Sequence, residues 1–111
     1  MGAPWRSALA QAMIEDLQVA ILPSKAKEAT EMFREMRDYV PPAAEARIVA
    51  TNGNQRIEFP TGGRVLFLGG HFRVRGMALD KLYVSFPVYH DHRLELEPAI
   101  ATSRIGEVIT F

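Results

Sequence analysis

The first third of the chain places its apolar residues at helical spacing, which predicts an amphipathic helix over residues 4–17. The residues on its inner face are Trp5, Leu9, Ala12, Met13 and Leu17. The next apolar run, 18–22, is short and partly β-branched, and Pro23 ends it, which predicts a buried strand. A second amphipathic helix is predicted from a cap at Ser24 to Val40, before the pair Pro41-Pro42.

The rest of the chain alternates short strand patterns with turn-forming residues. The predicted strands are 46–51, 56–59, 64–68, 81–86 and 106–111. The segments between them are predicted as turns at 52–54 and 61–63, a glycine-rich loop at 69–76, a polar run after Pro87 and a short helix at 94–102. This order predicts a single small α/β domain over residues 1–111, with a mixed β-sheet and flanking helices.

Composition narrows the class of protein. The 111 residues are enough for one domain with a buried core, and the absence of cysteine excludes a disulfide scaffold and a thiolate metal site. The 13 basic and 13 acidic side chains cancel, which argues against a globally basic nucleic-acid binder. Because no apolar run approaches the ~18 residues of a membrane span and the first residues lack a signal-peptide pattern, we expect a cytoplasmic protein without membrane contact.

The overall neutrality hides a basic middle segment. From Arg47 to Lys81 there are six Lys and Arg side chains and two acidic ones, so this stretch carries +4 and the remainder −4. Four residues around the glycine-rich loop are candidates for contact with nucleic-acid phosphates or a protein partner. They are Arg64, His71, Arg73 and Arg75. The alternative is a hairpin edge whose charges only prevent aggregation, and the sequence favours neither.

The string His90, Asp91 and His92 is the part of the chain most typical of a metal site, because imidazole and carboxylate are good ligands for transition metals. Adjacent residues of a strand or loop point in alternate directions, however, and the only other histidine is His71. We therefore expect a solvated loop and no metal site. With no cysteine and no Gly-x-Ser-x-Gly turn, we also expect no catalytic residue and no cofactor.

Several stretches follow one another in an order that has a parallel in a known family. They are a strand and helix over Val19–Ser24 and Ala29–Phe33, a hairpin over Ile57–Phe67, an Arg-Gly loop over Val74–Asp80, and a strand over Leu82–Phe86. This order resembles the P-loop ATPase domain of phage terminase large subunits. The resemblance implies a shortened P-loop type of α/β core.

The resemblance also implies two catalytic elements, and the sequence departs from both. Where the phosphate loop of that family ends in Lys and Ser or Thr, this chain has Arg6 and Ser7, with only six residues before Ser7. Where an Asp would hold magnesium and a Glu would orient water, this chain has Ser85 and Phe86. The resemblance therefore implies a catalytically silent protein.

These observations lead us to expect a noncatalytic, phage-encoded module that binds or interferes with another protein in the host cytosol. The expected contact is an exposed edge of the sheet, which would give a homo-oligomer or a complex with another protein. Two alternatives stay open. One is a residual nucleotide-binding or ATPase subunit that a partner chain completes, and the other is weak DNA binding by the basic segment.

Overall fold

The computed structural model describes residues 4–51 and 54–111. Its strands are β1 Gln18–Leu22, β2 Arg47–Val49, β3 Gln55–Glu58, β4 Arg64–Phe67, β5 Lys81–Val84 and β6 Glu107–Thr110. Its helices are α1 Ala8–Ile14, α2 Ala26–Arg37 and α3 Phe86–Leu96, with short 3-10 helices η1 Pro4–Ser7, η2 Pro42–Ala44, η3 His71–Val74 and η4 Glu97–Ala99.

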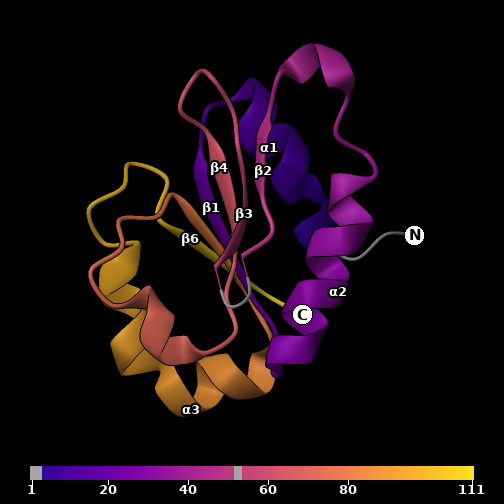
Figure 1. Ribbon diagram of the computed structural model, residues 1–111. Coiled ribbons are helices and arrows are strands. Elements are labelled where there is room, and N and C mark those ends of the chain that lie inside the picture. The colour runs from indigo at the N-terminus through magenta and orange to yellow at the C-terminus, as the bar shows by residue number, and fades with distance from the viewer. Residues whose placement is uncertain (1–3, 52–53) are drawn as a thin grey trace.

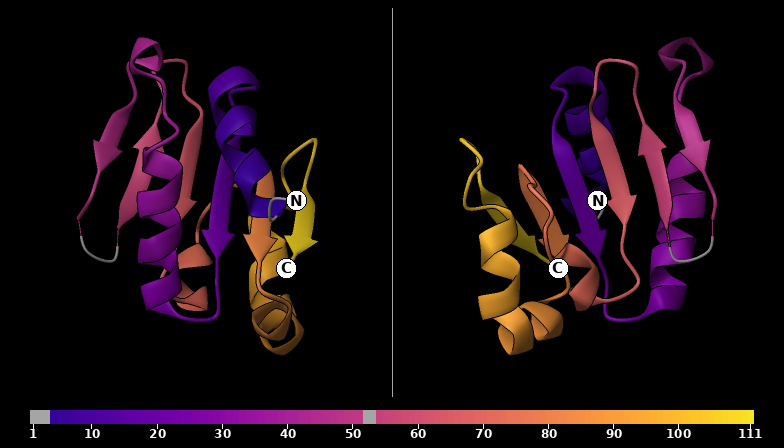
Figure 2. Two further views of the ribbon diagram at one scale, coloured as in Figure 1. Left: turned by 90° about the vertical axis from the view of Figure 1, so that its right-hand side faces the viewer. Right: turned by 60° about the vertical axis from the view of Figure 1, so that its left-hand side comes forward.

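These elements form three layers around one sheet. The strand order in the sheet is β2-β3-β4-β1-β5-β6. Helices α1 and α2 cover one face of the sheet, and α3 covers the other (Figure 1). Strands β2 and β6 lie at the two edges (Figure 2). The predicted fold class, an α/β domain with a mixed sheet and flanking helices, is confirmed.

The sheet is mixed because the connections differ in length. The central strand β1 is parallel to both neighbours, with Ala20 opposite Leu66 of β4 and Leu82 of β5. Strand β6 extends the parallel set beyond β5, whereas β2, β3 and β4 pair as antiparallel hairpins. Short turns suffice for antiparallel neighbours, while parallel neighbours need longer crossovers.

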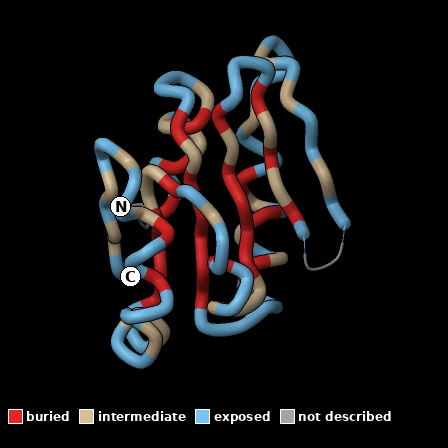
Figure 3. The backbone as a smooth tube through the Cα atoms, turned by 90° about the vertical axis from the view of Figure 1, so that its left-hand side faces the viewer, coloured by how far each residue is buried: buried red, intermediate tan, exposed pale blue. Residues whose placement is uncertain are grey.

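Alternate residues of the central strands fill two cores, one on each face of the sheet. Val19 and Ile21 of β1 pack into the core beneath α1 and α2, which also contains Phe33 of α2. Ala20 and Leu22 pack into the core beneath α3. Figure 3 shows the resulting continuous stretches of buried residues. Burial on both faces explains why 18–22 is almost uniformly apolar.

The N-terminal helix is shorter than the predicted span of 4–17. It begins as η1, and α1 ends at Ile14, because Asp16 adopts a left-handed backbone conformation (φ 59°) that turns the chain toward β1. Gly63, in the turn before β4, lies against this helix. A Cβ atom at Gly63 would overlap the carbonyl oxygen of Ala12, so the close approach of the hairpin to α1 requires glycine.

The largest difference from the sequence prediction concerns α3. Strand β5 ends at Val84, and α3 begins at Phe86, with Pro87 in its first turn. Proline is favoured there because the first turn of a helix needs no N–H from it. The predicted helix at 94–102 is therefore misplaced, since the helix begins earlier and ends at Leu96.

The polar run at 90–92 is part of this helix, so the prediction of a loop is wrong. The backbone of His92 departs from helical values (φ −127°, ψ 22°) and kinks α3.

Smaller differences are the shorter β2 within the predicted 46–51 and the presence of η3 inside the predicted loop 69–76. Residues 52 and 53 of the predicted turn lie outside the described residues. In the part of the chain that the structure describes, no helix is long and apolar enough to cross a membrane.

Candidate functional site

The carboxyl ends of β1 and β5 meet where the chain changes direction across the sheet. After β1 the chain enters α2, which packs on one face of the sheet, on the β4 side of β1. After β5 the chain enters α3, which packs on the opposite face, on the β6 side of β5. A change of this kind between adjacent parallel strands is the usual position of a ligand site in open α/β sheets. The carboxyl ends of β1 and β5 are therefore the expected position of a ligand site in this fold.

Two serine hydroxyls meet at this position. Ser24 follows β1 and Ser85 follows β5, and their Oγ atoms lie 2.8 Å apart. Ser85 is buried, whereas Ser24 is exposed. The prediction that Ser24 caps α2 is wrong, because Lys25 occupies the cap position and the Ser24 hydroxyl contacts Ser85. The pair offers hydrogen-bonding groups but no negative charge.

The two aspartates nearest to Ser85 in the sequence, Asp80 and Asp91, lie before β5 and on α3. Asp80 precedes β5, at the opposite end of that strand, and it accepts hydrogen bonds from the Gln18 N–H (2.7 Å) and the Ser103 hydroxyl (2.6 Å). Asp91 is exposed on α3, more than one helical turn beyond Ser85. Asp80 thus ties β1 to the segment before β6, which is a structural role.

Arg6, which the resemblance to the terminase family places at the position of the phosphate-loop lysine, is engaged on the surface. Its Nη2 atom lies 3.0 Å from the carboxylate of Glu35 on α2. Glu35 is nine residues after Ala26, or about 2.5 turns from the end of α2 that adjoins Ser24. Both partners of this ion pair are exposed. Arg6 therefore contacts α2 rather than the Ser24–Ser85 pair.

The four predicted contact residues fall into two groups. Arg64 begins β4, and its Nε atom donates a hydrogen bond to Oε1 of Gln18 (2.6 Å). The other three residues lie past the end of β4, in η3 or directly after it. Of these, Arg73 and Arg75 are exposed, while His71 is half-buried. Only Arg73 and Arg75 keep the character of a solvent-facing basic pair.

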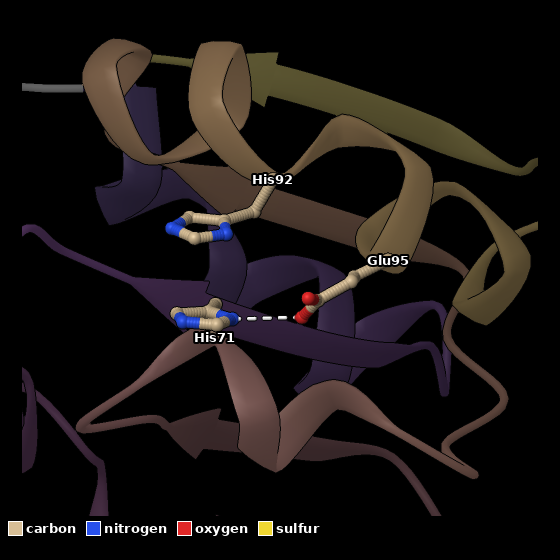
Figure 4. Close-up of side chains that lie close together, drawn as sticks. All are labelled: His71, His92 and Glu95. Carbon is tan, nitrogen blue, oxygen red and sulfur yellow. Dashed lines mark hydrogen bonds and ion pairs between the residues drawn. The ribbon is translucent and has the colours of Figure 1, made fainter.

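His71 belongs to a cluster that the sequence did not predict. Its Nδ1 atom donates a hydrogen bond to Oε2 of Glu95 on α3 (2.8 Å). Its ring stacks on the ring of His92, with centroids 3.6 Å apart and planes 9° apart. Figure 4 shows His92 and Glu95 projecting from α3 toward His71. One nitrogen or oxygen atom from each residue lies within 4.8 Å of the other two.

The local fold explains this cluster and its charge. His92 and Glu95 are three residues apart on α3, so they share a face of the helix, and η3 brings His71 against that face. The hydrogen bond from His71 lowers the pKa of the Glu95 carboxyl, and the nearby Arg75 guanidinium and the His71 and His92 rings act in the same direction, although desolvation opposes them. Glu95 is consequently a carboxylate at neutral pH.

The sequence contained one signal for the cluster, namely the position of Pro87. If Pro87 is placed in the first turn of a helix, then His92 and Glu95 fall on one helical face. The contact of that face with His71 depends on how η3 packs against α3, and no local pattern of residues encodes it.

The fold is similar to that of a large terminase from a thermophilic bacteriophage, solved in complex with ADP. The alignment has a TM-score of 0.63 and 11% sequence identity, covers 96% of this chain, and spans only 28% of the terminase chain. This chain has a terminase-like α/β fold. No protein-family model matches its sequence, and no curated protein matches it significantly.

Proposed function

We propose that this terminase-like chain is noncatalytic and acts by binding another protein chain along the outer edge of β6. The proposal that the chain is noncatalytic is supported by Ser85, the residue that follows β5. An ATPase of this fold needs a magnesium-binding Asp there. Ser85 is a buried hydroxyl bonded to Ser24, so it supplies neither the negative charge nor a base.

The edge strand β6 supports a role in binding. Among the described strands, its one neighbour is β5. The N–H groups of Glu107 and Phe111 donate to carbonyls on the β5 side. Because the backbone groups of alternate residues point to opposite sides of a strand, the N–H groups of Val108 and Thr110 point outward. An outward-facing row of this kind is a template for a strand from a second chain.

The sequence of β6 favours a second copy of this chain as the partner. An antiparallel pair centred on Ile109 places Val108 opposite Thr110, whose N–H groups both face the second copy, and Glu107 opposite Phe111, so no like charges face each other. The charge of Glu107 is also matched within the chain by Lys81, at 3.0 Å. Ile105, just before β6, is 44% exposed and extends the apolar surface at this edge. A two-fold pairing would bury the same strand of both copies.

A second candidate function is nucleotide binding that a partner chain completes, and the ADP in the terminase of similar fold favours it. Weak DNA binding has less support. Within residues 4–51 and 54–111, Arg64 and His71 make side-chain hydrogen bonds, and of the four predicted residues only Arg73 and Arg75 are exposed and make none. The bacteriophage source of the terminase supports a phage origin for this chain and a place in the host cytosol.

The direct test of catalytic silence is incubation of the purified chain with Mg-ATP. We expect no phosphate release above the buffer background and no change in melting temperature with Mg-ATP or Mg-ADP. Magnesium-dependent hydrolysis that the Arg6→Ala variant abolishes contradicts the proposal. Thermal stabilisation by Mg-ADP without hydrolysis supports the nucleotide-binding candidate instead.

A further inference from the structure

We propose that His71, His92 and Glu95 form a binding site for a divalent transition-metal ion such as Zn²⁺. Two imidazoles and one carboxylate are a donor set that zinc takes with water in the fourth position. The fold brings one such atom from each residue within 4.8 Å of the others. The site lies on η3 and α3 and contains no residue of β6, so the proposal does not rest on the proposed partner binding.

The position of the cluster suits an ion that arrives from solvent. The side chains of His71 and Glu95 are 35% and 38% exposed, so an ion can reach them and retain a water ligand. The ligands come from two segments, with His71 and Glu95 24 positions apart in the sequence, and the ion would join η3 to α3. Because an ion of this kind binds the folded chain and not the unfolded one, it would also stabilise the domain.

The hydrogen bond between His71 and Glu95 marks where the ion would sit. In the metal-free chain a proton on Nδ1 lies between the two side chains, which are 2.8 Å apart. A metal ion would replace this proton, since a ligating histidine nitrogen must be deprotonated. The N–O separation would then widen to suit metal–ligand bonds of about 2.0–2.2 Å on either side.

The stacked rings must open when the ion binds. A ring nitrogen ligates through a lone pair in the ring plane, and the planes of His71 and His92 are only 9° apart. Both lone pairs cannot converge on one ion until one ring tilts. His92 is the ring able to tilt, because it lies at the kink in α3, whereas His71 is held by its hydrogen bond to Glu95. Loss of ring stacking is therefore a signature of metal binding at this site.

The test is a calorimetric titration of the full chain with ZnCl₂ at about pH 7.5, where neutral imidazole is available. We expect one ion per chain. His92→Ala and Glu95→Gln should each weaken Zn²⁺ binding at least about tenfold. Loss of a residue that only supports a metal ligand already weakens binding by about 10–100-fold, so loss of a ligand should cost no less. The matched controls His90→Ala and Glu97→Gln lie outside the cluster, on α3 and directly after it, and should change affinity less than about twofold.

A second measurement separates loss of ligation from loss of folding. Circular dichroism should show the wild-type helix and strand content in all four variants, and NMR of the wild type should show Zn²⁺-dependent shifts of the His71 and His92 ring protons. The proposal is overturned if the wild type binds no Zn²⁺. It is equally overturned if the His92 and His90 variants bind Zn²⁺ with the same affinity.

Discussion

The hydroxyl oxygens of Ser24 and Ser85 lie 2.8 Å apart although 61 residues separate them in the sequence. This contact joins the carboxyl ends of β1 and β5, the central parallel pair of the sheet. The serine pair contributes to holding these two strands together.

The serine pair should therefore contribute to stability. Ser85→Ala removes the buried hydroxyl of a partly buried hydrogen bond, and we expect the free energy of unfolding to fall by about 1 kcal/mol. Ser24→Ala should cost less, because Ser24 is exposed and water can replace the bond. Urea unfolding of both single variants and the double variant measures the coupling. Strictly additive effects would show that the two hydroxyls do not interact.

The close approach of the β3–β4 turn to α1 predicts strong intolerance at Gly63. In Gly63→Ala the new methyl group meets the backbone of Ala12, which cannot move aside as a side chain can. Overpacking of this kind usually costs about 1–3 kcal/mol, and we expect the free energy of unfolding of Gly63→Ala to fall by about 3 kcal/mol or more. Gly69→Ala is the matched control, since its Cβ would lie 3.3 Å from the Cβ of Ala26. Equal melting temperatures for the two variants would contradict this packing.

The ion pair between Lys81 and Glu107 predicts a pH dependence of stability. The hydrogen bond to Glu107 raises the pKa of Lys81 above 10.5. A pKa raised by folding means that the stabilisation is present below 10.5 and is lost as the pH rises through the folded value. Glu107→Gln should be less stable than the wild type by under about 1 kcal/mol at neutral pH. This difference should shrink at strongly alkaline pH, and a difference that grows there would contradict the assignment.

The sequence predicted the elements whose patterns are local. The apolar run 18–22 coincides with β1, and the helical spacing through Phe33 predicts α2, although the helix ends at Arg37 and not at the predicted Val40. The mixed character of the sheet followed from short turns in the middle of the chain and longer connections elsewhere. These features depend on residues close together in the sequence, where the periodicity of burial is visible.

The errors arose where tertiary contacts decide the outcome. Ser24 looks like a helix cap, but its hydroxyl is taken by Ser85 from a distant strand. Pro87 looks like the end of a strand, but it begins α3 and places His92 on that helix. The contact of His92 with His71 then depends on the packing of η3 against α3. The fold class was therefore accessible from the sequence, whereas both side-chain clusters were not.

The most direct test of the central claim is the mass of the chain measured by light scattering over a range of concentrations. Wild type and Thr110→Ala should shift from monomer to dimer as concentration rises. Thr110→Pro should remain monomeric, because proline removes an outward-facing N–H of β6 while the bonds from Glu107 and Phe111 to β5 are kept. A wild-type chain that is monomeric at every concentration, or a Thr110→Pro variant that dimerises as the wild type does, would contradict the account.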